Sequence, residues 1–220
     1  MPARPVLEQG QNKFSPQPTP VPLDSRCYSD NSIKRCVESD LTHEEKIVEF
    51  SYIILRTPEF RPAYYHRGAA YLELRQYEKP LADFNRAIEM GYSAETELYG
   101  KLGHVHRALD NHKEALLSYE IHKELDPCNA WPYHYIGKVH FDLEEYEKAI
   151  ESWEIYAEMR QLNGEYPSYR SAHERIGQAY LELGLFSKAL ESFNIAIEGD
   201  PNPEAHLLKL KEEAESKIQK

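Results

Sequence analysis

The sequence has few cysteines, and their spacing suits neither a bridge network nor a metal site. They number three in 220 residues, and no two form a CxxC pair: Cys27, Cys36 and Cys128. An odd count without such a pair argues against a disulfide framework and against a zinc ribbon. The sequence therefore predicts free thiols in a reducing compartment.

Long apolar runs and basic clusters are also missing. The longest apolar-rich stretch, IVEFSYIIL at 47–55, is too short to cross a bilayer and contains Glu49. The first residues include no apolar segment of signal-peptide length. Lys and Arg number 26 against 37 Asp and Glu, a net charge of −11 that would repel a phosphate backbone. We expect a cytoplasmic or nuclear protein with no membrane insertion and no nucleic-acid partner.

Catalytic motifs are absent too. The sequence contains no GxGxxG, no P-loop and no GxSxG. Its many glutamates, as in EEYEKAIE at 144–151, alternate with lysine at helical spacing and indicate a solvated helix face. We therefore expect no enzyme activity and no cofactor.

The chain begins with a proline-rich segment and then becomes helical. Six prolines fall within residues 1–24, which predicts a disordered tail over 1–26. From about residue 40 the apolar spacing is that of α-helices, with no strand-like alternation. Thr42 and Glu45 have the spacing of a capping box, and Pro58 would end the helix that follows.

Four segments of the helical part resemble one another. Aligned on glycine, they place Gly68, Gly103, Gly137 and Gly177 at successive separations of 35, 34 and 40 residues. A period near 34 with two helices per unit is typical of a helical solenoid. The six extra residues fall in 160–169, where they either lengthen the second helix of the third unit or form a projecting loop.

The repeated pattern resembles the tetratricopeptide repeat. In the last unit the family's positions are filled by His173, Ile176, Gly177, Tyr180, Ala189, Phe193, Ala196 and Pro201. The resemblance implies an all-α fold, a right-handed superhelix (α-solenoid) of antiparallel helix pairs. Small Gly and Ala residues allow the two helices to approach closely, and the aromatic residues fill the space to the next unit.

The repeat phase predicts the organisation of the whole chain. It gives four units within 61–203, preceded by a degenerate helical unit at 27–60 and followed by a polar capping helix at 204–220. The four units are expected at 61–94, 96–129, 130–163 and 170–203.

Four histidines between residues 98 and 127 raise the question of a metal site. His106 and His122 occupy packing positions of the repeat, and His112 lies near a turn. Only His104 is expected to face the concave groove that repeats of this family form. A metal site needs three or four converging ligands, and no suitably spaced carboxylate or thiol accompanies these residues. We expect no metal.

The resemblance also implies a concave groove lined by the first helix of each unit. Its expected peptide-binding residues are Tyr65, His104, Arg107, Trp131, His134, Lys138, Phe141 and Gln178. Trp, Tyr and Arg dominate the energetics of many interfaces, and a basic centre in an acidic chain suits an acidic peptide with an apolar anchor. The sequence thus predicts a non-catalytic adaptor or scaffold that binds a partner peptide or helix, alone or within a larger complex.

Two alternatives stay open. One is a co-chaperone role, although of the positions that form the family's carboxylate clamp only Arg175 matches. The other is a histidine-based metal-binding or catalytic protein.

Overall fold

The chain folds into a row of α-helices. The computed structural model describes residues 40–92, 96–198 and 202–218, and every regular element in these ranges is helical. None of these helices is long and apolar enough to cross a membrane. The predicted tail at 1–26, Cys27, Cys36 and the predicted first unit before residue 40 lie outside the described residues. The helices are α2 (His43–Arg56), α3 (Arg61–Glu73), α4 (Glu78–Glu89), α5 (Thr96–Ala108), α6 (His112–Leu125), α7 (Trp131–Asp142), α8 (Tyr146–Leu162), α9 (Tyr166–Glu182), α10 (Phe186–Ile197) and α11 (Ala205–Ile218).

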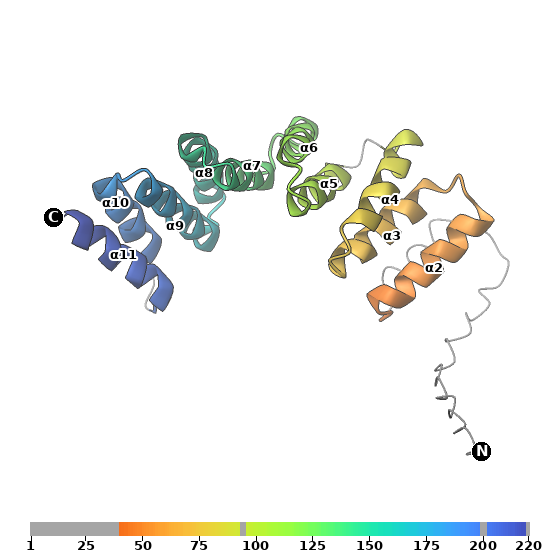
Figure 1. The fold of residues 1–220 in the computed structure, drawn as a ribbon, viewed down its shortest axis with the longest axis horizontal. Helices are drawn as coiled ribbons and strands as arrows, with labels where there is room; N and C mark the ends of the chain where they lie inside the picture. Colours follow the sequence, from red (N-terminus) through yellow and green to blue (C-terminus); the bar gives the residue numbers. More distant parts are fainter. Residues whose placement is uncertain (1–39, 93–95, 199–201, 219–220) are drawn as a thin grey trace, which may run out of the picture.

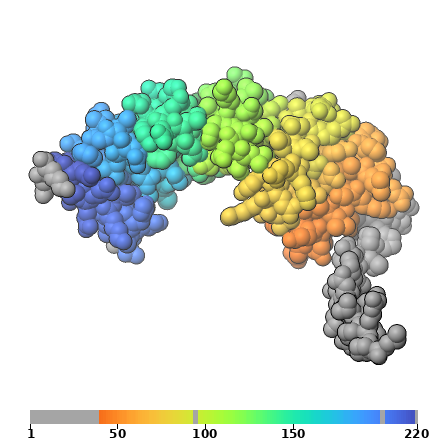
Figure 2. Space-filling view, viewed as in Figure 1, coloured from red at the N-terminus to blue at the C-terminus, as the bar shows by residue number. Residues whose placement is uncertain are grey.

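Successive helices pack side by side and build an arch. Helix α2 lies near one end of the arch and α11 at the other, with α5 on the inner side and α6 on the outer side (Figure 1). The space-filling view shows a hollow beneath the middle of the arch (Figure 2). This is the all-α solenoid that the repeat pattern predicted.

Each helix pair is joined by a contact between a glycine and an aromatic ring. A Cβ added to any of the four repeat glycines would lie 2.4 to 2.7 Å from an atom of that ring. The rings come from the second helix of each pair and are at most 1% exposed. The glycines are therefore needed for close approach of the helices, not for turns. The four contacts are Gly68–Phe84, Gly103–Tyr119, Gly137–Trp153 and Gly177–Phe193.

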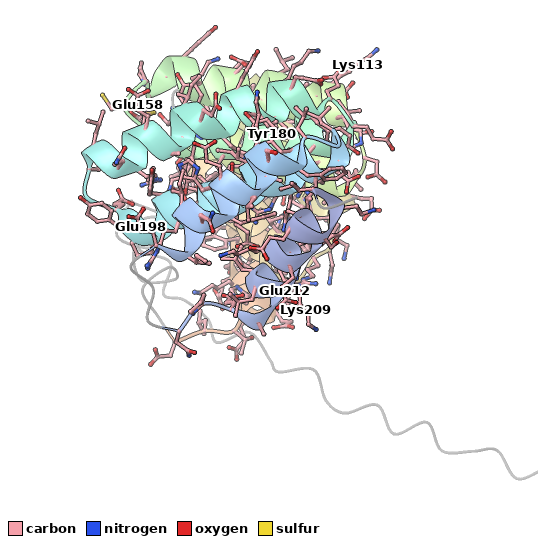
Figure 3. All side chains as sticks on the ribbon, turned by 90° about the vertical axis from the view of Figure 1, so that its left-hand side faces the viewer. Lys113, Glu158, Tyr180, Glu198, Lys209 and Glu212 are labelled. Atoms are coloured by element: carbon pink, nitrogen blue, oxygen red, sulfur yellow. The ribbon has the colours of Figure 1, made fainter. Side chains whose placement is uncertain are left out.

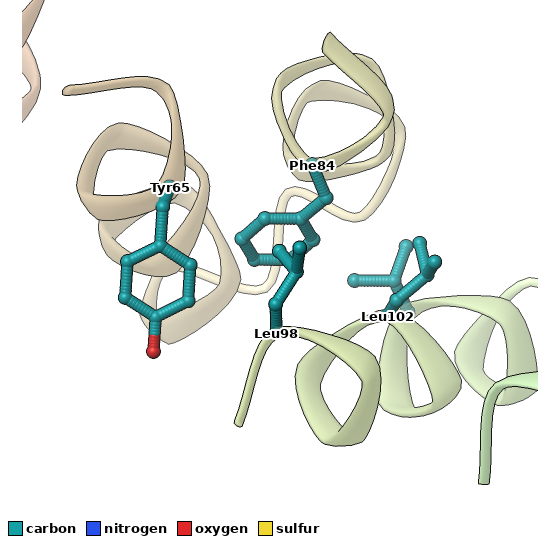
Figure 4. Close-up of a cluster of buried hydrophobic side chains, with 5 residues drawn as sticks. Tyr65, Phe84, Leu98 and Leu102 are labelled. Carbon is teal, nitrogen blue, oxygen red and sulfur yellow. The ribbon is translucent and has the colours of Figure 1, made fainter. Parts of the chain in front are cut away.

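Apolar side chains fill the space between neighbouring pairs. At the junction of α4 and α5, Phe84 packs against Leu98 and Leu102, both from the next unit (Figure 4). Phe84 and Leu98 are fully buried. One ring thus joins its own unit through Gly68 and the following unit through α5.

Local signals set the helix ends. Thr42 Oγ1 accepts a hydrogen bond from the Glu45 N–H (3.2 Å), and the Thr42 N–H donates to Glu45 Oε2 (2.9 Å). This confirms the predicted capping box. The turn inside each pair contains one residue in the left-handed region at an equivalent place: Arg75, Asp110, Glu144 and Gly184, with φ of 55°, 57°, 60° and 70°.

The extra residues at 160–169 lengthen two helices and form no projecting loop. Helices α8 and α9 each have 17 residues and are separated by a short turn in which Gly164 has a φ of 73°. Helix α9 begins at Tyr166, four residues before the expected start of the fourth unit at 170. Pro167 is in the first turn of the helix, where a missing N–H is tolerated, so the helix starts earlier than the repeat phase indicates.

Candidate functional site

Six rings form a continuous layer at the middle of the array, which we call the aromatic cluster: His104, Tyr119, Trp131, His134, Tyr135 and Tyr156. They come from α5, α6, α7 and α8. Tyr135 is central, because its ring centroid lies 4.2 Å from that of His104 and stacks on Tyr119 at 5.3 Å and on Trp131 at 5.9 Å. The cluster links the second and third helix pairs.

Trp131 is the exposed edge of the aromatic cluster. Trp131 is the first residue of α7, and its ring contacts three other rings of the cluster. The residue is nevertheless 43% exposed. The Arg160 guanidinium lies 4.7 Å from the centroid of the Trp131 ring and 5.2 Å from that of Tyr156. Arg160 is in turn held by Glu165, with Nη1 2.6 Å and 2.7 Å from the two carboxylate oxygens. The indole is thus fixed in place while part of it faces solvent.

Three basic side chains from three helices share the space beside these rings, and we call them the basic centre: Arg107 of α5, Lys138 of α7 and Arg175 of α9. Burial lowers the pKa of Lys138, and Arg107 and Arg175 lower it further. Arg107 is paired with Asp142, with Nε 2.6 Å from Oδ2. Within the described residues, Lys138 and Arg175 form no ion pair. The middle of the array therefore gathers positive charge, in a chain whose net charge is −11.

The two histidines of the cluster are neutral. Burial, assisted by Lys138 and Arg107, lowers the pKa of His104 to about 4. Burial, assisted by Arg175 and Lys138, lowers the pKa of His134 to about 3. His134 is 8% exposed, and its buried Nδ1 has no hydrogen-bond partner among the described groups.

The other histidines of α5 and α6 lie apart from this layer. His122 packs against Gly100, where an added Cβ would be 2.9 Å from Nδ1, and His106 is half-buried on another face of α5. His112 begins α6 beside the turn. In the described ranges, no group of three or more His, Cys, Asp or Glu residues is placed to hold a metal ion.

Three of the predicted groove residues lie away from the aromatic cluster. Tyr65 is 7% exposed and lies in the preceding core, where it packs on Phe84 (Figure 4). It also packs on Tyr92. Phe141 packs on Trp153 and Tyr146 at the far end of α7. Gln178 lines a separate cleft of about 390 Å³ between α9 and α11. The other five predicted residues, His104, Arg107, Trp131, His134 and Lys138, are all in the central region.

Five further residues belong to this region and were not among the predicted groove residues: Tyr119, Tyr135, Tyr156, Arg160 and Arg175. Tyr135 and Arg175 occupy the same position in successive repeat units, and the sequence indicated Arg175 only as a match to the carboxylate clamp. Tyr156 and Arg160 lie on α8, a second helix. The repeat phase assigns second helices to the outer side, so it does not place Arg160 near Trp131. The extra residues that lengthen α8 were the one feature of the sequence that could have indicated this contact.

Comparisons with known proteins agree with this architecture. Tetratricopeptide-repeat family models match residues 62–90 and 136–203. No curated protein is similar enough in sequence to count as a relative.

Solved structures share the fold at low sequence identity. A crystal structure of MamA has a TM-score of 0.67 and 21% identity, covering 87% of this chain and 99% of MamA. YrrB, described as a TPR protein with an unusual peptide-binding site, has a TM-score of 0.65 and 20% identity, covering 84% and 86%. The N-terminal domain of stress-induced protein-1 from C. elegans has a TM-score of 0.51 and 21% identity, covering 57% and 98%.

Proposed function

Because the chain is a tetratricopeptide-repeat protein, we propose that it is a non-catalytic interaction scaffold that holds a peptide segment of a partner protein against its concave side. One observation carries the proposal: Trp131 is 43% exposed yet clamped by Arg160 and stacked on Tyr135. A large ring held in one orientation loses little conformational entropy when it binds, and Trp is enriched among the residues that dominate interfaces.

The neighbouring groups support the same proposal. Tyr135 extends the apolar surface beside Trp131, and Lys138 lies 6.0 Å from the centroid of the Tyr135 ring. The pairing of a partly exposed aromatic surface with basic side chains suits a linear segment that has an apolar anchor and polar neighbours. YrrB, which shares the fold, is described as having a peptide-binding site, and this is consistent with a peptide role for a solenoid of this kind.

A matched pair of truncations tests the proposal. Trp131→Ala removes the exposed ring of the aromatic cluster, and Leu117→Ala removes an apolar side chain of α6 that is 62% exposed. The purified variants would be compared with the wild type on an array of mixed-sequence octapeptides, after circular dichroism has shown that their helix content is unchanged. We expect Trp131→Ala to lower the affinity for the bound peptides by about tenfold or more, the loss typical of a central anchor. Leu117→Ala should leave this affinity unchanged. Equal binding by Trp131→Ala and the wild type would refute the concave site.

A further inference from the structure

The charges of the basic centre are not balanced within the described residues. Asp142 neutralises Arg107 at 2.6 Å, and Glu97 neutralises Lys101 of the same helix at 3.1 Å. Lys138 and Arg175 have no such partner among the described carboxylates. Lys138 is half-buried, and its ammonium lies 6.0 Å from the centroid of the Tyr135 ring. Asp142 also attracts it, but the carboxylate of Asp142 is paired with Arg107.

The basic centre also contains a hydrogen-bond donor that has no partner within the described structure. Arg175 is half-buried, and its buried Nε donates no hydrogen bond within the described structure. A guanidinium presents five N–H donors in a planar fork that matches a carboxylate, and an ammonium presents three. His134 is kept neutral by burial and by the positive charges of Arg175 and Lys138, which lower its pKa. Asp142 is one carboxylate among the three cations Arg107, Lys138 and Arg175 and is paired with Arg107, so the repulsion between the cations costs free energy that a bound anion would recover.

We propose that the peptide segment held on the concave side places an Asp or Glu carboxylate between Lys138 and Arg175, beside the apolar side chain that rests on Trp131. This rests on the proposed function, because it assigns the chemistry of a segment bound at the same surface. The acidic partner is favoured over a nucleic acid because the chain is strongly acidic overall, with 37 Asp and Glu against 26 Lys and Arg, so that its surface repels a phosphate backbone. An acidic residue next to an apolar anchor is thus the recognition element of the segment.

The probes are octapeptide mixtures in which only side chains carry charge. Each peptide is acetylated and amidated, with a central Glu, Gln, phosphoserine or Lys fixed next to a Leu and the other positions mixed. A twelve-residue oligouridine serves as the nucleic-acid probe. Binding would be measured by fluorescence anisotropy at 50 mM and 300 mM salt with the full chain.

Charge-matched variants isolate the role of the two cations. Lys138→Gln/Arg175→Gln removes the proposed carboxylate site. Lys113→Gln/Lys188→Gln removes the same net charge from exposed positions on the second helices α6 and α10, and Lys113 extends outward from the array (Figure 3). Because Lys138→Gln/Arg175→Gln relieves repulsion between like charges, it should fold at least as stably as the wild type. The single variant Lys138→Gln provides a second, milder test.

The outcomes separate the two proposals. We expect Glu peptides to bind about tenfold more tightly than Gln peptides at 50 mM salt, with a smaller preference at 300 mM, because charge-assisted hydrogen bonds are strong and screened by salt. The preference should vanish in Lys138→Gln/Arg175→Gln and persist in Lys113→Gln/Lys188→Gln. Equal binding of Glu and Gln peptides, or tighter binding of phosphoserine peptides or oligouridine, would overturn the carboxylate site. If Trp131→Ala still lowers the affinity for the peptides, the proposed function survives that result. If the affinity for every probe is independent of Trp131, the proposed function and the carboxylate site both fail.

Discussion

Replacing Gly137 with alanine tests whether the repeat is held together by the contact between glycine and ring. A Cβ at this position would lie 2.5 Å from Nε1, 2.7 Å from Cδ1 and 2.8 Å from Cε2 of Trp153. Ordinary contacts between carbon atoms are about 3.5–4.0 Å, so the indole must retreat by about 1 Å. The indole is 1% exposed, and its Nε1 donates a hydrogen bond of 3.1 Å to the His134 carbonyl oxygen, so it cannot move without disturbing both packing and bonding.

The expected loss of stability combines three effects. Overpacking a well-filled core costs about 1–3 kcal/mol. Weakening the indole hydrogen bond costs about 1 kcal/mol. Alanine is favoured over glycine in a helix interior by about 1 kcal/mol, which offsets part of this loss. We expect Gly137→Ala to lower the free energy of unfolding by about 2 kcal/mol, although helix propensity alone predicts a gain.

A double-variant cycle identifies the ring as the cause. Urea denaturation at 25 °C, followed by circular dichroism, would be carried out on the wild type, Gly137→Ala, Trp153→Leu and the double variant. Trp153→Leu is destabilising by itself, but adding Gly137→Ala in that background should cost nothing or should stabilise, because the clashing atoms are gone. A neutral or stabilising Gly137→Ala in the wild-type background, or an equal cost in both backgrounds, would refute the packing explanation.

Three further predictions concern charges and turns. Asp83 is 5% exposed and accepts hydrogen bonds of 2.8 Å and 2.6 Å from Arg67, so Asp83→Ala should cost about 3 kcal/mol in urea denaturation, while Glu89→Ala in the exposed Arg86–Glu89 pair should leave the stability nearly unchanged. Similar small losses for both would contradict the burial argument. The folded-state pKa values of His104 and His134, about 4 and 3, are below the ordinary value of 6.5, so the unfolded chain takes up these protons first as the pH falls. Their contribution to stability is complete above pH 6.5 and decreases below it, by about 2 kcal/mol per histidine between pH 7 and pH 5, and ring signals that titrate near 6.5 in NMR spectra would contradict this. Glu144 has a φ of 60°, so Glu144→Gly should raise the free energy of unfolding by about 0.5–1 kcal/mol and increase the melting temperature, whereas Glu147→Gly inside α8 should lower both.

The sequence predicted the solenoid because the repeat positions are also the packing positions. Gly103 and Tyr119 recur at the same separation as Gly177 and Phe193, and each pair forms the same contact. Where a residue is required for packing, its spacing determines its neighbour, and the spacing can be read without coordinates. The helix pairs and the capping box at Thr42 were predictable for this reason.

The site was only partly predictable because packing does not fix the side chains of the inner side. The repeat phase placed Trp131 and Lys138 on one surface, but it also placed Tyr65 there, and that ring is buried against Tyr92. Whether a ring is exposed depends on the neighbours it meets across two helices, and these have no fixed separation in the sequence. Arg160 shows the limit most clearly, because it reaches Trp131 from a second helix.

The six extra residues explain why Arg160 can reach Trp131. Helix α8 has 17 residues, whereas the other second helices α4 and α10 have 12 and α6 has 14. Arg160 lies in the last turn of α8, and the residue that holds it, Glu165, directly precedes α9. Helices α4 and α10 end before the position that corresponds to Arg160, so neither helix carries a side chain at that place. The lengthened region therefore supplies both Arg160, which clamps Trp131, and the carboxylate that fixes Arg160, so the departure from the repeat and the exposed aromatic surface belong to one structural unit.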